Sequence, residues 1–381
     1  MDNPFVYGEV TPQAAFVDRE EELDRLVGDL RSGQKVFLVS PRRFGKSSLI
    51  HQALRACGRG GLLTADVTVS SYSSFVAFLE GYARALVAAE TRLDRLTSWL
   101  RDLFTAVRPE VRVEADTAGA GRFAIAFPSV RTARDETRLA VEVFDLPARI
   151  ASTRNRRVAV ALDEFQAIAG FDGERVEHQL RAAIQRQRDV GYVFAGSEPA
   201  LMERMLGRQR PFYKAGPVVR LGRVPAERFA TFIDARFKQT GLRPEPGLGT
   251  AVVDLAANMP YDVQRLAHET WDDVRVARRK TVTLDDLHAT LGRLLGEYDT
   301  LFERAWQGLT LPQRATLRAA VLEDGRELLS ADARTRYRLA GPSSVQASLA
   351  ALVRQEIAMR EGDRYIVVDS LFREWVARRT F

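Results

Sequence analysis

Cysteine is almost absent from this chain of 381 residues, because Cys57 is the only one. An internal disulfide and a cysteine metal cluster are therefore excluded, and a single thiol suits a reducing cytoplasm, where we expect the protein to be located. No stretch approaches the ~18 uninterrupted apolar residues of a membrane span. The first residues, MDNPFVYGEV, lack the features of a signal peptide. We expect no contact with a membrane.

Histidine and lysine are also scarce. The four histidines show no metal-ligand spacing. Ser40 and Ser47 have no partner base, which argues against a serine hydrolase. The net charge of +6 comes mostly from arginine in an arginine-rich chain, so by itself it is weak evidence for a nucleic-acid partner. The composition, 46% hydrophobic and 28% charged, is that of a soluble globular protein, and the length indicates two or three domains.

A phosphate-binding loop is predicted in the stretch KVFLVSPRRFGKSSLI, residues 35–50. KVFLVS is short, apolar and β-branched, as in a buried strand, and SSLIHQALRACG has the periodicity of a helix. The turn between them has the strand–loop–helix context of G-x-x-x-x-G-K-[ST], with Ser40 in place of the first glycine. A small serine followed by the rigid Pro41 suits a tight exit from the strand.

The residue types in this turn suit a polyphosphate and Mg²⁺. Backbone amides and the positive helix end would face the phosphates. Gly45 would allow close approach, Lys46 would reach the β- and γ-phosphates, and the Ser47 hydroxyl would ligate Mg²⁺. A chance G-K-S in an arbitrary turn is the alternative. The predicted ATP- or ADP-binding residues of the loop are Ser40, Pro41, Arg42, Arg43, Phe44, Gly45, Lys46, Ser47 and Ser48.

An acidic pair follows a second apolar strand in RRVAVALDEFQAI. Carboxylates at the carboxyl end of a buried strand lie where open α/β sheets bind ligands. Asp163 would hold Mg²⁺ through water, and Glu164 would polarise the attacking water. An acidic helix N-terminus that complements the helix dipole is the alternative. Together with the phosphate loop, the pair favours a nucleotide site whose catalytic residues are Lys46, Asp163 and Glu164.

A third short strand, Tyr192–Ala195, ends in Gly196 and Ser197. A polar side chain there would lie between the phosphate loop and the acidic pair, close to the γ-phosphate. Ser197 could equally cap the helix that begins in EPALMERML. Both roles are compatible with one position.

These motifs make the chain resemble the archaeal-type P-loop ATPases, an AAA+-related group that neighbours the STAND signalling ATPases. The resemblance extends from NPFVYGEVTPQAAFVDREEEL through SPRRFGKSSLI, VALDEF, FAGSEPALM and NMPYDVQRL to YIVVDSLFREW. It implies an α/β core with a five-stranded parallel sheet, a helical lid and a C-terminal winged helix. The expected domains are residues 1–224, with a β-hairpin insertion near 109–130, then residues 225–298 and 299–381.

By the same resemblance, the N-terminal segment near Phe5, Tyr7, Phe16 and Arg19 would contact adenine or ribose. From the residues alone, these aromatic side chains are equally suited to ordinary packing of an N-terminal arm.

The lid motif departs from the AAA+ pattern. In NMPYDVQRL, Pro260 fits the form found in STAND relatives, whereas Tyr261 occupies the usual position of the arginine that senses the γ-phosphate. Arg265 is one helical turn further along. We therefore expect Pro260 and Tyr261 near the nucleotide, no lid arginine on the γ-phosphate, and slow turnover. Pro260 could also simply begin the helix.

The stretch MLGRQRPFYKAG supplies Arg208 and Arg210 as candidate arginine fingers for a neighbouring subunit. Solvated surface charge is the alternative.

The last segment, residues 299–381, has the order helix, helix, helix and strand pair of a winged helix. Ser343, Ser344 and Gln346 begin the third helix and could reach DNA base edges. That helix carries no lysine or arginine before Arg354, which disfavours phosphate contacts and favours an interaction or autoinhibitory module.

The sequence thus predicts a slow ATP- and Mg²⁺-dependent switch ATPase that controls domain arrangement or assembly, with a protein partner or self-association. The alternative is a DNA-binding initiator- or regulator-like protein in which the nucleotide is structural. A third is a degenerate ATPase that holds ADP permanently.

Overall fold

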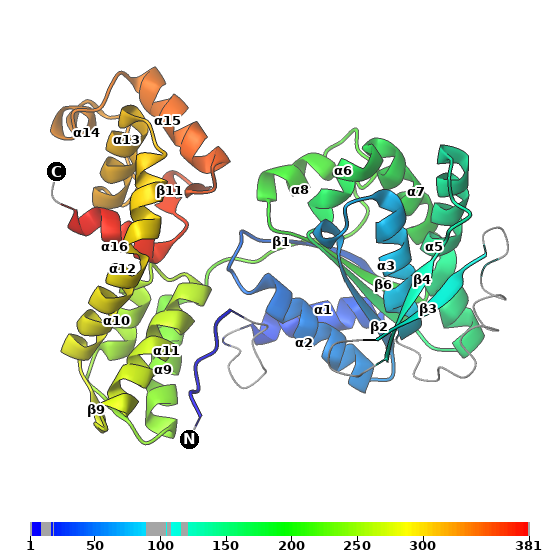
Figure 1. Cartoon of the computed structure of the whole chain (residues 1–381), viewed down its shortest axis with the longest axis horizontal. Helices are drawn as coiled ribbons and strands as arrows, with labels where there is room; N and C mark the ends of the chain where they lie inside the picture. The colour runs from blue at the N-terminus through cyan, green and yellow to red at the C-terminus, as the bar shows by residue number, and fades with distance from the viewer. Residues whose placement is uncertain are drawn as a thin grey trace. The chain divides into compact units, whose positions relative to one another are not determined.

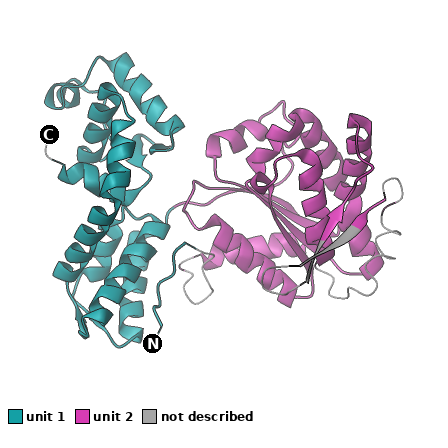
Figure 2. Cartoon of the chain, in the orientation of Figure 1, with its two compact units in different colours: residues 1–9, 223–381 teal, residues 10–222 magenta. Residues whose placement is uncertain are grey.

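The computed structural model describes residues 2–8, 17, 19–88, 104, 108–115 and 121–379. It divides into two compact units (Figure 2). One, which we call the core unit, comprises Val10–Gly222. The other, the lid–wing unit, combines Met1–Glu9 with Arg223–Phe381. The first residues of the chain therefore belong to the same unit as the C-terminal part.

A five-stranded parallel sheet with the order β2–β5–β6–β1–β7 forms the centre of the core unit (Figure 1). This confirms the predicted α/β fold class with a parallel sheet. The strands are β1 (Lys35–Val39), β2 (Leu63–Thr68), β5 (Val158–Asp163), β6 (Val190–Gly196) and β7 (Val218–Arg220). Strands β5 and β6 are buried along their whole length, as expected for parallel strands covered on both faces.

Helices cover both faces of this sheet. Alternate side chains of β1 enter different clusters: Val36 and Leu38 pack with the helices of one face, and Phe37 and Val39 with those of the other. The first face carries α1 (Glu20–Arg31) and α2 (Lys46–Arg59); the second carries α3 (Phe75–Ala88), α5 (Ala133–Arg154) and α7 (Glu174–Ile184). The shorter core elements are η2 (Val69–Ser71), η4 (Phe165–Ile168), α6 (Ala169–Asp172) and α8 (Pro199–Met205).

Strand β2 differs from β5 and β6 in its burial. It lies at an edge of the sheet and pairs only with β5, and Asp66 and Thr68 are exposed while Ala65 and Val67 are buried. Its alternate residues Leu63, Ala65 and Val67 pack into the apolar cluster of one face of the sheet. The antiparallel pair β3 (Glu110–Ala115) and β4 (Gly121–Ala126) forms a separate two-stranded sheet.

The lid–wing unit begins, after the N-terminal segment, with helices and two very short strands. These are α9 (Ala226–Gln239), β8 (Arg243–Pro244), α10 (Leu248–Leu255), α11 (Pro260–Val276), β9 (Thr281–Val282) and α12 (Leu284–Gln307). Helix α12 is continuous through residue 298, where the sequence suggests the end of the lid.

A winged helix follows, as predicted. Its elements are α13 (Leu311–Leu322), α14 (Ala331–Arg336), α15 (Pro342–Arg354), the antiparallel strands β10 (Ala358–Glu361) and β11 (Arg364–Val367), and α16 (Ser370–Arg378). Among the described residues of the whole chain, no helix combines the length and apolarity needed to cross a membrane.

Candidate nucleotide-binding site

The phosphate loop leaves β1 at Ser40, whose side chain is fully buried. Its backbone amide donates to the Gly196 carbonyl over 3.2 Å, and its hydroxyl donates to the Pro41 carbonyl over 3.0 Å. Ser40 therefore links the carboxyl ends of β1 and β6. The serine in place of the first glycine of the motif has room and a hydrogen-bonding role.

The bend of the loop depends on left-handed backbone at two positions. Arg43 has φ 69°, and Gly45, directly before α2, has φ 86°. A Cβ atom built on Gly45 would meet nothing within 4 Å, so space is open above the loop. The N-cap residue of α2 is Gly45, which has no side chain to accept a hydrogen bond from the first turn of the helix. Amides at an uncapped helix start, facing open space, fit a phosphate group.

Four predicted residues converge beside this bend. Lys46, whose side chain is only 5% exposed, forms an ion pair with Asp163, and its Nζ lies 3.2 Å from Oε1 of Glu164. The Ser47 hydroxyl donates to Oδ2 of Asp163 over 2.8 Å. Residues more than 100 positions apart meet because the loop after β1 and the end of β5 lie at the same edge of the sheet.

The oxygen atoms at this site suit Mg²⁺ that is bound together with a nucleotide. They are too few to hold a metal ion by protein ligands alone. A hydroxyl and a carboxylate, Ser47 and Asp163, are hard ligands. Within the described part of the chain, no group of three or more His, Cys, Asp or Glu side chains could hold a metal ion. Mg²⁺ typically takes one or two protein carboxylates and completes its coordination with phosphate and water.

Ser197 lies between the loop and the acidic pair because β6 separates β1 from β5. Its hydroxyl donates to Oε2 of Glu164 over 2.5 Å, while the N-cap of α8 is the next residue, Glu198. Burial raises the pKa of Glu164, but the hydrogen bond from Ser197, the charge of Lys46 and a hydrogen bond from Gln166 outweigh it and leave the pKa below its usual range. Glu164 is thus held ionised at neutral pH, as a proton acceptor must be.

Two residues of this region are absent from the sequence prediction. Gln166 is buried and also donates to Glu164. Asp66 on β2 is exposed to solvent, yet surrounding protein atoms raise the pKa of its carboxyl, the Asp163 carboxylate raises it further, and His51 and Lys46 oppose this. Two features of the sequence could have indicated these residues. Gln166 is a polar residue two places after the acidic pair in DEFQ, and Asp66 is an acidic residue inside an apolar strand.

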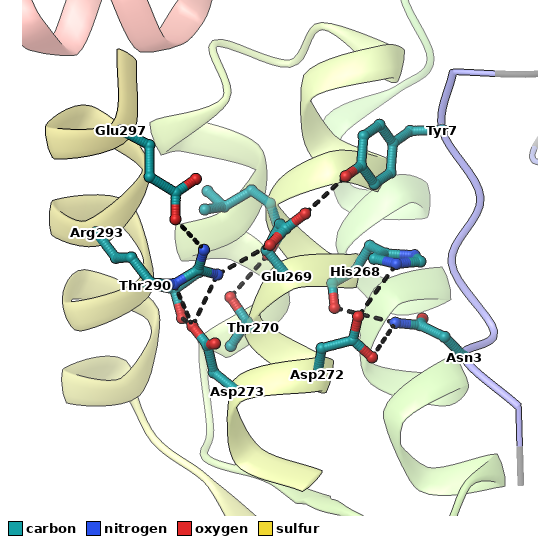
Figure 3. Close-up of polar contacts among 11 residues, drawn as sticks. Asn3, Tyr7, His268, Glu269, Thr270, Asp272, Asp273, Thr290, Arg293 and Glu297 are labelled. Atoms are coloured by element: carbon teal, nitrogen blue, oxygen red, sulfur yellow. Dashed lines mark hydrogen bonds and ion pairs between the residues drawn. The ribbon is translucent and has the colours of Figure 1, made fainter. Parts of the chain in front are cut away.

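The N-terminal arm, residues 2–8, packs against α11 of the lid–wing unit (Figure 3). Phe5 is 1% exposed, and its ring is tilted against that of Phe237 with 4.8 Å between the ring centroids. The Tyr7 hydroxyl donates to Glu269 over 2.6 Å, and its ring meets His268 edge-on at 5.0 Å. Burial, and then the hydrogen bond to Glu269, raise the pKa of Tyr7 to about 12. Of the two interpretations of Phe5 and Tyr7, the contacts favour arm packing.

The other two residues of that lead-in remain predictions as nucleotide contacts. Phe16 lies outside the described residues. Arg19 is buried in the core unit, donates to the Gly222 carbonyl and pairs with Glu22 at 2.9 Å.

The lid motif opens α11. Pro260 is the first residue of the helix, and the Tyr261 ring lies edge-on to Tyr7 at 5.9 Å. Arg265 is 8% exposed and stacks over the Tyr298 ring at 4.5 Å, so this arginine packs between α11 and α12. Both Pro260 and Tyr261 belong to the lid–wing unit, and their contact with a nucleotide remains a prediction.

The candidate arginine fingers differ in their surroundings. Arg208 is exposed, whereas Arg210 pairs with Glu174 and, at 2.5 Å, with the fully buried Glu177. On the winged helix, Ser343 and Gln346 are exposed at the start of α15, and Ser344 is half-buried. Nothing in the contacts tests a role of these five residues toward a partner.

The fold and the strand-end cluster define the class: a P-loop ATPase fold of the AAA+ type with a C-terminal winged helix. Residues 300–378 match the family described as a probable winged helix domain. The whole chain is similar to the Walker-type ATPase PABY2304 of Pyrococcus abyssi, with 17% identity, a TM-score of 0.63, and coverage of 97% of this chain and 99% of that one.

Two Aeropyrum pernix proteins also share the fold. The Aeropyrum pernix ORC1 protein in complex with DNA has 14% identity and a TM-score of 0.53 over 96% of this chain and 94% of its own. The Aeropyrum pernix ORC2 protein in ADPNP–ADP complexes has 13% identity and a TM-score of 0.50 over 98% and 97%. No curated protein matches the sequence. At these identities the likeness shows the fold.

Proposed function

We propose that this chain binds ATP with Mg²⁺ at residues 40–48 and hydrolyses it slowly, as a nucleotide-dependent switch of domain arrangement or assembly. The observation that carries the proposal is the convergence of the Lys46 amine and the Ser47 hydroxyl on Asp163, at the carboxyl ends of two parallel strands, β1 and β5, of one sheet. The ORC2 protein, which shares the fold, is described in ADPNP–ADP complexes, and this supports nucleotide binding.

In the proposed reaction, Lys46 exchanges its carboxylate partners for phosphate oxygens, and the amides at the start of α2 face the phosphates. Ser47 and Asp163 would hold Mg²⁺, which neutralises phosphate charge when bound. Glu164 accepts a proton from the attacking water as the new oxygen–phosphorus bond forms and the bond to the β–γ bridging oxygen breaks, leaving ADP and phosphate. Its hydrogen-bonded, ionised carboxylate suits this step.

Slow turnover follows from what the lid lacks. Tyr261 stands where relatives place a charge-stabilising arginine, and Arg265 stacks on Tyr298. An arginine finger from a neighbouring subunit, for which Arg208 is a candidate, would raise the rate of hydrolysis by ~10³–10⁵-fold. Without such a finger, hydrolysis should be slow.

The test is the nucleotide content of the purified protein and its ATP turnover with Mg²⁺, for the wild type, Lys46→Ala and Glu164→Gln. We expect exchangeable ATP binding and slow turnover that Glu164→Gln removes. Non-exchangeable ADP with no turnover would instead indicate a structural nucleotide. Tight ATP binding by Lys46→Ala would contradict the proposed site.

A second candidate function is DNA binding through the winged helix. It is favoured by the match of residues 300–378 and by the fold shared with an ORC1 protein described in complex with DNA. Salt-titrated binding of duplex DNA by the full chain tests it: no affinity at low salt removes this candidate.

A further inference from the structure

Gln166, on η4, contacts the proposed catalytic carboxylate directly. Its side chain is 7% exposed, and its Nε2 donates to Oε2 of Glu164 over 2.6 Å. The same nitrogen lies 3.4 Å from the Ser197 hydroxyl and 3.4 Å from Oε1 of Glu198. One amide group therefore contacts three polar side chains at the ends of β5 and β6.

The backbone of Glu164 and its side-chain contacts together fix the orientation of its carboxylate. Glu164 has φ 52° and ψ 43°, a left-handed conformation that is uncommon for a residue with a Cβ atom. Its amide donates to the Asp163 carboxylate over 2.8 Å. With two donors on Oε2, from Gln166 and Ser197, and Lys46 near Oε1, both carboxylate oxygens of Glu164 are oriented.

The space for the Gln166 amide is made by Gly196. A Cβ atom at Gly196 would lie 2.8 Å from Oε1 of Gln166 and 2.4 Å from the Met202 side chain. Oε1 of Gln166 is buried and has no hydrogen-bond partner in the described part of the chain. A methionine would fill the same space without burying an unpaired oxygen, so packing alone does not account for an amide here.

We propose that Gln166 is a positioning residue for Glu164 in ATP hydrolysis, acting with Ser197 from the opposite element. The inference rests on the proposed function. Through its Nε2 donor, Gln166 holds Oε2 of Glu164 and leaves Oε1 as the oxygen that becomes available once Lys46 turns to a phosphate. Donors to this carboxylate also favour its ionised form.

The test compares Gln166→Met, which keeps the length but removes the donor, with Gln187→Met as a matched control. Gln187 is a buried glutamine of the same unit that donates to the Phe144 carbonyl over 2.7 Å. We expect kcat of Gln166→Met to fall roughly 10- to 100-fold, because a misplaced catalytic group costs up to about 10²-fold. Its ATP affinity should stay unchanged. The acid limb of its pH–rate profile should move to higher pH, because the lost donor stabilised ionised Glu164.

A second measurement does not depend on turnover. NMR titration of carbon-13-labelled glutamate, with the Glu164 signal assigned through Glu164→Gln, should show a higher Glu164 pKa in Gln166→Met than in the wild type or Gln187→Met. An unchanged Glu164 titration and an unchanged kcat in Gln166→Met, with ATP binding intact, would overturn the positioning role. Equal ATP turnover of Glu164→Gln and the wild type would instead contradict the proposed function. In that case the titration would still show whether Gln166 holds the Glu164 carboxylate.

Discussion

The strand ends of the core unit and helix α15 of the winged helix are two candidate ligand surfaces built in opposite ways. At the strand ends, a buried lysine meets two carboxylates, Asp163 and Glu164, and hydrogen-bonded side chains from three elements converge. The exposed residues of α15 are small or uncharged up to Val353, and Arg354 is its first cation. The charged cluster has an arrangement that suits a polyphosphate, whereas α15 offers little to neutralise a DNA backbone.

The two surfaces would obtain affinity for their ligands, a polyphosphate and DNA, from different kinds of contact. Buried charges are costly unless they are paired, so the pairs at Lys46 keep the site stable before a phosphate replaces the carboxylates. Base-edge contacts from Ser343 or Gln346 would specify sequence, but phosphate contacts supply most of the non-specific affinity for DNA. The following experiments break or sharpen this contrast.

The largest expected effect on ATP affinity is that of Lys46→Ala. Removal of a charge-assisted contact to phosphate should weaken binding by roughly 10- to 150-fold, because such a contact is worth about 1.5–3 kcal/mol. The substitution also leaves the buried carboxylates without their cation. Titration with a fluorescent ATP analogue measures this.

Lys35→Met is the matched control for that variant. Lys35 is a half-buried lysine at the start of β1 whose amine donates to the carbonyls of Gly33 and Gln187. Its loss should lower stability and leave ATP affinity unchanged. Equal losses of affinity in both variants would point to unfolding rather than a site.

Glu164→Gln should reduce ATP turnover by about 10²- to 10⁴-fold, the usual contribution of a positioned proton acceptor. ATP affinity should be retained, since the amide keeps the shape of the carboxylate. Steady-state turnover and equilibrium binding separate the two effects, with the exposed Glu203→Gln as a control. A variant with wild-type turnover would remove Glu164 from the reaction.

The pH dependence of kcat/KM for ATP, which reports the nucleotide-free protein, should follow the lowered pKa of Glu164. Only the ionised form of Glu164 can accept a proton, and the pKa of this group in the folded protein lies below the usual value of about 4.3. The acid limb of the pH–rate profile should therefore lie below that pH. The value of kcat/KM should be insensitive to this group from pH ~5 upward. A Glu164-dependent acid limb near neutral pH would contradict the observed hydrogen bonds.

Substitutions on α15 should have a smaller effect. If the winged helix reads DNA bases, Gln346→Ala should cost about 1–3 kcal/mol for one sequence only. From its uncharged exposed face we expect weak binding of duplex DNA by the full chain and less than a ~3-fold change in Ser343→Ala or Gln346→Ala. Fluorescence anisotropy across a salt series measures this. A tight, sequence-specific complex lost in Gln346→Ala would break the contrast.

The smallest expected effect is that of Tyr7→Phe on the lid–wing unit. Loss of the hydrogen bond to Glu269 should lower the free energy of unfolding by ~1 kcal/mol. Denaturant unfolding measures this change. Tyr213→Phe is the control, because Tyr213 is exposed to solvent. Equal stability of Tyr7→Phe and the wild type would argue against a stabilising arm.

Much of the candidate site could be predicted from local sequence. The strand–turn–helix pattern placed Ser40, Gly45 and Lys46 in a loop, and the apolar run before Asp163 placed that carboxylate at a strand end. Gln166 was not predicted, because its role depends on the space that Gly196 leaves on a different strand. The position of β2 at an edge of the sheet follows from the strand order and not from its local sequence.

By itself, the sequence determined the local conformations: periodicity specified the strands and helices, and glycine and lysine marked the loop before α2. Only the tertiary structure decided which distant side chains meet. The strand order placed Ser197 between the loop and Glu164, and the chain path placed Phe5 and Tyr7 on α11 instead of in the core unit. Local patterns reflect backbone preferences over a few residues, whereas these contacts depend on how entire elements pack together.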